Sequence, residues 1–158
     1  MRKIILSPST PNRTERSQVD DYLDIERLAQ VELSSEHPEF PIESALLGEA
    51  GPGWRAASSG IQTIRLVFDE PLAIKKVVLV FEETTLERTQ EFVLRWSAEN
   101  GALSEILRQQ FHFSPPDTVQ EIEQYTVNLS VVKSLELEIN PGFDSPLSIA
   151  SLRELRLA

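Results

Sequence analysis

The sequence predicts an all-β protein built as an antiparallel β-sandwich or jelly roll. Apolar and polar residues alternate over many short stretches, which is the period of a strand with one buried face. Turn-forming residues separate these stretches, and no long amphipathic helical pattern occurs in the 158 residues. Short strands divided by turns, with no helices to cover a sheet, favour two antiparallel layers packed face to face.

The elements follow in chain order. Residues 1–27 are expected to form a polar lead-in, in which residues 20–28 have the pattern of one or two helical turns and Ser17 stands in a capping position. A sandwich domain is expected over residues 28–158. Its strands are predicted at 29–34, 61–68, 74–82, 90–97, 105–113, 121–129, 135–140 and 152–157.

The alternation is clearest in LELEIN, where Leu135, Leu137 and Ile139 face one side and two glutamates face the other. The run IKKVVLVF is apolar on both faces after Lys76, which indicates a central strand covered on both sides. Turn signals divide the strands: DEP at 69–71, AENG at 98–101, SPPD at 114–117 and NPGFDSP at 140–146.

Composition limits the classes of function. The net charge of -10 opposes binding to phosphate backbones and to anionic membranes, so neither nucleic acid nor a membrane is expected as a partner of this acidic protein. The absence of cysteine excludes disulfides, thiolate nucleophiles and zinc sites built on sulfur. No signal-peptide core or membrane span is recognisable, and a cytoplasmic location is expected.

Six segments carry a family resemblance. AQVELSS has the pattern of an opening strand, IESALLGE of a short turn, and GWRAASS of a stretch centred on a tryptophan. GIQTIRLVFDEPLAIKKVVLVF has the pattern of two paired strands, and VKSLELEIN with SIASLRELRLA that of the last two strands. In this order and spacing they resemble the discoidin or coagulation-factor C-type group of the galactose-binding-like β-sandwiches. The resemblance covers about residues 28–158.

The connection before Trp54 is rich in proline and glycine. Pro38, Pro41 and Pro52 fix backbone angles, so a long loop can hold one shape while it crosses the end of a sandwich. Trp54 has two interpretations, an indole that plugs the end of the sandwich or a platform on which a sugar ring stacks. Packing is favoured, because large aromatic residues beside a strand are usually buried.

The resemblance also implies where a ligand binds. In this group the ligand usually meets the loops beside the first strand and the tryptophan, together with a loop between middle strands. Arginine offers a planar fork of donors for sugar hydroxyls or a carboxylate, and an aromatic face can stack on a ring. The candidate ligand-binding residues are His37, Phe40, Trp54, Arg55, Glu83 and Arg88.

No cofactor is expected, and calcium is the one alternative. Many sugar-binding members of the group hold calcium with an aspartate in the turn before the glycine and a glutamate in the final strand. Here Leu47 stands at the aspartate position, whereas Glu154 matches the glutamate and Glu49 is a nearby carboxylate. A leucine offers no oxygen ligand, which disfavours calcium bound by Glu49 and Glu154.

A catalytic constellation is not recognisable. The two histidines, His37 and His112, lack the spacing of a zinc site or a triad. Adjacent acids such as Glu82 and Glu83 point to opposite faces of a strand. The predicted function is a non-catalytic module that binds a carbohydrate or similar small polar ligand. The alternative is a protein-interaction or assembly subunit of an intracellular complex, and an enzyme acting through carboxylates is least favoured.

Overall fold

The structure is a computed structural model that describes residues 22–47, 51–99, 101–143 and 147–158. Its elements are α2 (Ile25–Leu28), β1 (Ala29–Leu33), α3 (Glu43–Leu46), β2 (Trp54–Arg55), β3 (Gln62–Glu82), β4 (Arg88–Ser97), β5 (Ser104–Phe113), β6 (Gln120–Asn140), β7 (Ser151–Leu152) and β8 (Glu154–Leu157). Within these ranges the strands form one antiparallel sheet in the order β1–β3–β6–β4–β5, with β8 paired to β3, and a small sheet of β2 and β7. The predicted all-β antiparallel fold is confirmed.

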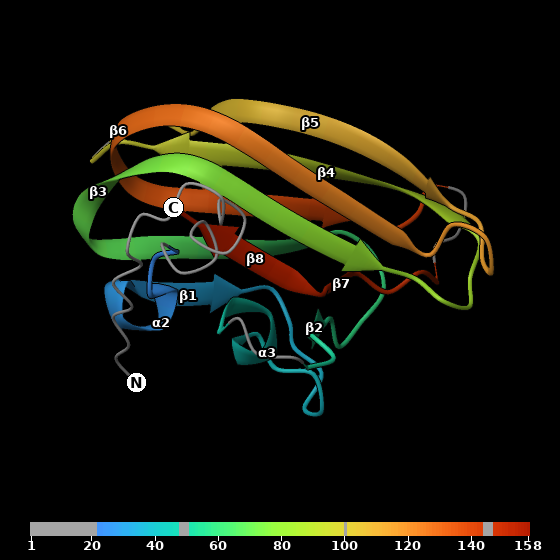
Figure 1. The fold of residues 1–158 in the computed structure, drawn as a ribbon. Helices are drawn as coiled ribbons and strands as arrows, with labels where there is room; N and C mark the ends of the chain where they lie inside the picture. Colours follow the sequence, from blue (N-terminus) through green and yellow to red (C-terminus); the bar gives the residue numbers. More distant parts are fainter. Residues whose placement is uncertain (1–21, 48–50, 100, 144–146) are drawn as a thin grey trace, which may run out of the picture.

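Two long strands turn this sheet back on itself. The first half of β3 pairs with β1 and with the second half of β6, whereas its second half pairs with β8 and with the first half of β6. The change of partner coincides with register shifts between Val67 and Lys76, and Figure 1 shows both ribbons curving back at one end of the molecule. Two layers result.

The prediction of a turn at 69–71 is therefore wrong. The strand continues through DEP because a β-bulge can bend a strand sharply while its pairing resumes on the far side. For the same reason the stretches 121–129 and 135–140 belong to the single strand β6.

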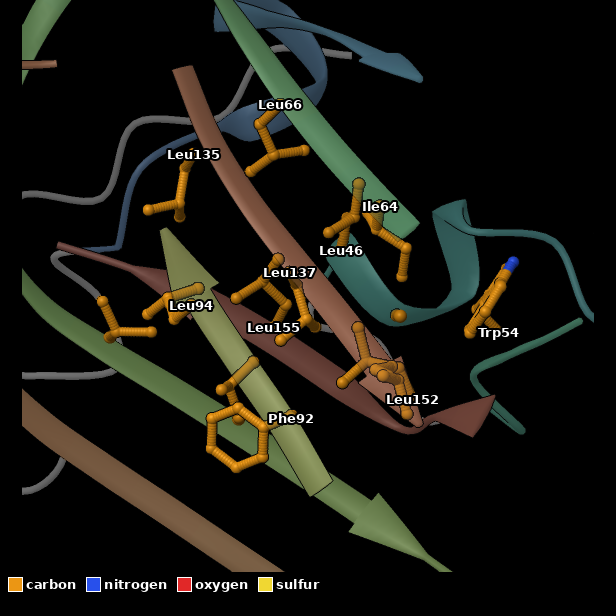
Figure 2. Close-up of a cluster of buried hydrophobic side chains, with 14 of the residues drawn as sticks. Leu46, Trp54, Ile64, Leu66, Phe92, Leu94, Leu135, Leu137, Leu152 and Leu155 are labelled. Carbon is orange, nitrogen blue, oxygen red and sulfur yellow. The ribbon is translucent and has the colours of Figure 1, made fainter. Parts of the chain in front are cut away.

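The core lies between the two layers. Ile64, Leu66 and Phe68 on the first half of β3 are buried, as are Leu135 and Leu137 on β6. Figure 2 shows how side chains from both layers and from α3 meet in this cluster. The alternation read from LELEIN is confirmed. The second half of β3 is a central strand, as predicted, with β6 on one side and β8 on the other.

Residues shortly before residue 28 contact the sandwich. The backbone N–H of Leu23 donates to the carbonyl of Leu157 at 2.7 Å, and Ile25 is buried in the core. The domain boundary at residue 28 stays a prediction. Helix α2 is a single turn, and Ser17 lies outside the described residues.

The connections that follow β1, β3, β5 and β6 all leave the sheet at one end of the sandwich, on the right in Figure 1. We call this the loop end. In the described part of the chain, no helix has the length and apolar character needed to cross a membrane.

Candidate functional site

The segment between β1 and β2 is held to the loop end by side-chain hydrogen bonds. Gln62, the buried first residue of β3, accepts hydrogen bonds from the hydroxyls of Ser34 and Ser35, each at 2.7 Å. Glu36 accepts the backbone N–H of Ile42 at 2.7 Å. These bonds fix the backbone on both sides of His37, so the loop presents its side chains in defined positions.

Trp54 plugs the end of the sandwich. Its side chain is 1% exposed, lies beside Leu152 in Figure 2, and donates its indole N–H to the carbonyl of Ser35 at 3.2 Å. The preceding Gly53 has φ +84°, and a Cβ atom there would lie 2.5 Å from the Leu152 carbonyl oxygen. Only glycine lets the chain enter at this angle.

The placement of Trp54 agrees with the packing interpretation that the sequence favoured. The buried indole has no free face on which a sugar ring can stack in this structure, and direct contact of Trp54 with a ligand stays a prediction. Trp54 positions the next residue, Arg55, whose side chain is exposed.

His37, Phe40 and Arg55 form a compact group on this loop surface. The Arg55 guanidinium lies over the Phe40 ring, 4.8 Å from its centroid, and the His37 ring meets Phe40 edge-on at 5.2 Å. The backbone joins the same residues: the His37 N–H donates to the Arg55 carbonyl at 2.8 Å, and the Arg55 N–H donates to the Phe40 carbonyl at 3.2 Å. Three predicted site residues are thus brought together.

The hydrogen bonds define what this group can offer a ligand. The backbone N–H of Glu39 donates to Nδ1 of His37 at 3.1 Å, so the neutral imidazole carries its proton on Nε2. That N–H and the guanidinium are two sets of donors next to an aromatic ring. One face of Phe40 is covered by Arg55, so a ligand meets either the other face of the ring or the guanidinium itself.

Glu83 and Arg88 have a structural role. The Arg88 side chain is 1% exposed and donates from Nε to Glu83 at 2.7 Å and from Nη1 to the Pro141 carbonyl at 2.7 Å. Its guanidinium also lies 4.9 Å from the centroid of the Phe113 ring. This enclosure argues against direct contact between Arg88 and a ligand, and ligand binding by Arg88 stays a prediction.

Glu83 is occupied by its own loop. One carboxylate oxygen accepts from Arg88, and the other accepts the backbone N–H groups of Thr85 and Leu86 at 3.1 and 3.0 Å. Burial acts to raise the pKa of Glu83, but the hydrogen bonds from Arg88, Thr85 and Leu86 outweigh it and lower that pKa. The carboxylate therefore stays ionised and shapes the connection between β3 and β4. Ligand binding by Glu83 stays a prediction.

A buried polar chain continues from Arg88 into the space between the layers. Arg88 donates to the Gln90 amide oxygen at 3.1 Å, and the Gln90 amide donates to Glu121 at 3.0 Å. Burial, together with a hydrogen bond to Glu123, raises the pKa of Glu121 to about 9. Sequence reasoning missed this chain, because Gln90 and Glu121 are far apart in sequence and neither belongs to a motif.

The two groups of predicted residues lie at the same end of the sandwich without touching. Ser151 of β7 pairs with Arg55 of β2, and its hydroxyl donates to the carbonyl of Glu82 at 3.5 Å. Within the described ranges, no hydrogen bond or ion pair joins His37, Phe40 or Arg55 to the buried pair of Glu83 and Arg88.

The prediction that calcium binding by Glu49 and Glu154 is disfavoured stays a prediction. Glu154 begins β8 and is half-buried, whereas Glu49 lies outside the described residues. The residues that the structure does describe contain no group of three or more His, Asp or Glu side chains placed to hold a metal ion.

A hollow of about 300 Å³ lies between β1 and α3. Val31, Leu46 and Leu47 give it an apolar lining, and Glu36 and Glu43 add carboxylates. It has no aromatic wall, so it lacks the character expected of a sugar pocket. Leu47, which stands at the predicted calcium position, lines this hollow.

Comparisons with known proteins agree with the fold. No protein-family model and no curated protein matches the sequence. The structure is similar to the family 32 carbohydrate-binding module of NanJ from C. perfringens, in complex with galactose, at 12% identity and a TM-score of 0.65, over 86% of this chain and 96% of that one.

Two further structures give the same result. A family 32 module from Clostridium perfringens, in complex with GalNAc-β-1,3-galactose, matches at 16% identity and a TM-score of 0.64, over 87% and 99% of the two chains. The family 32 module of AlyQ, in complex with 4,5-unsaturated mannuronic acid, matches at 14% and 0.61, over 83% and 95%. The chain therefore has the galactose-binding-like, discoidin-like β-sandwich fold that the sequence resemblance implied.

Proposed function

We propose that this protein is a non-catalytic module that binds a carbohydrate or a similar small polar ligand at the loop end of its sandwich. The observation that carries this proposal is the group of His37, Phe40 and Arg55, which combines an aromatic ring with two sets of hydrogen-bond donors. A sugar needs both, because its C–H faces pack on aromatic rings and its hydroxyls need polar partners. The sugar complexes of similar folds support this assignment.

The surroundings favour binding over catalysis. Glycoside hydrolysis by two carboxylates requires both to face one cleft. The acidic neighbours at the loop end are engaged separately: Glu82 pairs with Arg153 at 3.1 Å, and Glu83 pairs with Arg88 at 2.7 Å. Because these two carboxylates are bound to different arginines, the arrangement supports a module without catalytic activity.

The test is a glycan array followed by calorimetry, with and without calcium. Phe40→Ala removes the ring under Arg55, and we expect it to weaken the binding of any captured sugar roughly tenfold. Phe143→Ala is the matched control, because Phe143 is a phenylalanine 50% exposed elsewhere at the loop end, and binding should be unchanged. Capture of no glycan by the wild-type protein, under either condition, would contradict the proposal.

One observation favours the alternative of a protein-docking subunit. Ile61, Phe143 and Leu147 are 56%, 50% and 80% exposed, and the Gly60 N–H donates to the Ser148 carbonyl at 3.4 Å, which brings the chain beside Ile61 close to that beside Leu147. Exposed apolar side chains on neighbouring segments are typical of protein contacts. A role as a subunit of an intracellular complex, the alternative that the sequence left open, fits this surface.

A comparison of the variants Leu147→Ser and Phe40→Ala distinguishes protein docking from sugar binding. Capture of a protein from the native cell that is lost in Leu147→Ser and kept in Phe40→Ala supports docking. The reverse pattern, measured with a glycan, supports sugar binding.

A further inference from the structure

Arg55 differs from most of the arginines that the structure describes, because it has no carboxylate partner among the described residues. Five arginines within the described ranges form ion pairs, namely Arg65, Arg88, Arg95, Arg108 and Arg153. Arg55 forms none with any residue that the structure describes. Acidic residues outnumber basic ones by 25 to 15, and yet Arg55 has no acid partner among the described residues.

The contacts of Arg55 hold it in place without neutralising it. Its guanidinium rests on the Phe40 ring, and its backbone N–H and carbonyl are bonded to Phe40 and His37. A guanidinium fixed in this way loses little conformational freedom when it binds, and its planar fork matches the two oxygens of a carboxylate. Arg55 is exposed, so its guanidinium is accessible to a ligand.

Two other arginines without an ion pair in the described part lack this setting. Arg156 lies over the Tyr22 ring, 4.7 Å from its centroid, on the outer face of β8. Arg27 lies on α2 and has no such ring contact. Only Arg55 stands beside a histidine donor and an aromatic ring in the group assigned to ligand binding.

The charge of the whole protein strengthens the argument. A net charge of -10 repels anions, so an anionic ligand requires a local positive group to bind. A neutral sugar does not require one, because neutral donors can satisfy its hydroxyls. A fixed, unneutralised arginine is therefore better matched to a carboxylate than to a hydroxyl.

We infer, resting on the proposed carbohydrate-binding function, that the ligand is an acidic sugar of the hexuronate class, whose carboxylate pairs with the Arg55 guanidinium. The His37 Nε2–H then donates to an oxygen of the same residue of the ligand.

The experiment is isothermal titration with galacturonate and mannuronate trisaccharides, each compared with its methyl ester. The ester keeps the ring and hydroxyls but removes the charge. We expect the acid of at least one pair to bind about tenfold more tightly than its ester at low ionic strength, since hydrogen bonds between charged groups are the stronger ones. Added salt should reduce this preference.

Variants test whether Arg55 causes the preference for the acid over its ester. Arg55→Gln should abolish the preference, so that acid and ester bind with equal affinity, while Arg55→Lys should keep part of the preference. Arg27→Gln is the matched control, because it removes the same charge from an exposed arginine on α2, and it should change nothing. Thermal unfolding of each variant checks that the fold is retained.

The outcomes are distinguishable. If neutral sugars or the esters bind as tightly as the acids, the inference is wrong and the carbohydrate function stands. If the acids are preferred but Arg55→Gln keeps the preference, the inference is also wrong. If no sugar of any kind binds, the proposed function and this inference fail together.

Discussion

At the scale of single residues, Glu121 is the polar side chain that most affects the energetics of the core. It is 1% exposed, and its neighbours in the polar chain are Gln90 and Glu123. An ionised carboxylate at this depth is unfavourable unless a cation pairs with it, and the nearest guanidinium, that of Arg88, is already paired with Glu83. The proton therefore stays on Glu121 at neutral pH.

This proton makes stability depend on pH. The pKa of Glu121 is about 9 in the folded protein, against 4.5 for an ordinary glutamate. Between these values the folded state binds a proton that the unfolded state releases, so the free energy of unfolding falls as pH rises. We expect Glu121→Gln, which is neutral at every pH, to gain roughly 1 kcal/mol over the wild type for each pH unit in this window.

Urea unfolding of both proteins at several pH values from about 5 to about 8 measures this difference. Glu39→Gln, a change at an exposed glutamate, is the control and should keep the wild-type slope. A gap between Glu121→Gln and the wild type that is constant with pH would mean that Glu121 is already ionised in the folded state.

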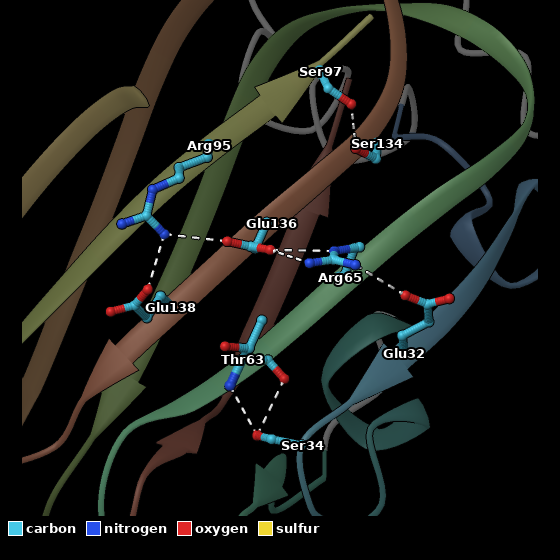
Figure 3. Close-up of polar contacts among 9 residues, drawn as sticks. All are labelled: Glu32, Ser34, Thr63, Arg65, Arg95, Ser97, Ser134, Glu136 and Glu138. Atoms are coloured by element: carbon cyan, nitrogen blue, oxygen red, sulfur yellow. Dashed lines mark hydrogen bonds and ion pairs between the residues drawn. The ribbon is translucent and has the colours of Figure 1, made fainter. Parts of the chain in front are cut away.

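At the scale of elements, a row of charged side chains joins four strands (Figure 3). It lies on the outer face of the layer formed by β1, the first half of β3, the second half of β6 and β4. Glu136 on β6 accepts from Arg65 on β3 at 2.7 Å and from Arg95 on β4 at 3.1 Å. Arg65 extends the row to Glu32 on β1, and Arg95 extends it to Glu138. Glu136 is 7% exposed because the two arginines cover it.

Removing the charge of Glu136 tests whether this row stabilises the pairing of β3, β6 and β4. Glu136→Gln leaves two guanidinium groups facing each other without the shared acid, and we expect a loss of about 2 kcal/mol in the free energy of unfolding. Glu105→Gln is the control, because Glu105 and its partner Arg108 are both about half exposed, and little change is expected. Equal effects of the two changes would show that the row adds nothing beyond surface pairing.

At the scale of the whole molecule, the sequence was informative wherever a local pattern determines structure. Alternation in LELEIN placed Leu135, Leu137 and Ile139 in the core, since side chains on a strand alternate by geometry. The family resemblance gave the fold and gathered His37, Phe40 and Arg55 on one loop surface. Each of these inferences used residues that are close in sequence or follow a fixed order.

The errors arose where distant residues decide the outcome. The bend of β3 at 69–71 was read as a turn because its pairing with β6 and β1 cannot be seen locally. The enclosure of Arg88 could not be foreseen, because it depends on Pro141 and Phe113, which come later in the chain. The partners of Gln90 and Glu121 could not be foreseen for the same reason.

The central claim is that the loop surface of His37, Phe40 and Arg55 is the place where this module binds a sugar. The most direct measurement is a ¹H–¹⁵N correlation spectrum of the protein titrated with the tightest-binding glycan. The largest shifts are predicted for the backbone amides of His37, Phe40 and Arg55 and for the Arg55 side chain. Shifts that instead centre on the hollow between β1 and α3, with those signals unmoved, would contradict the claim.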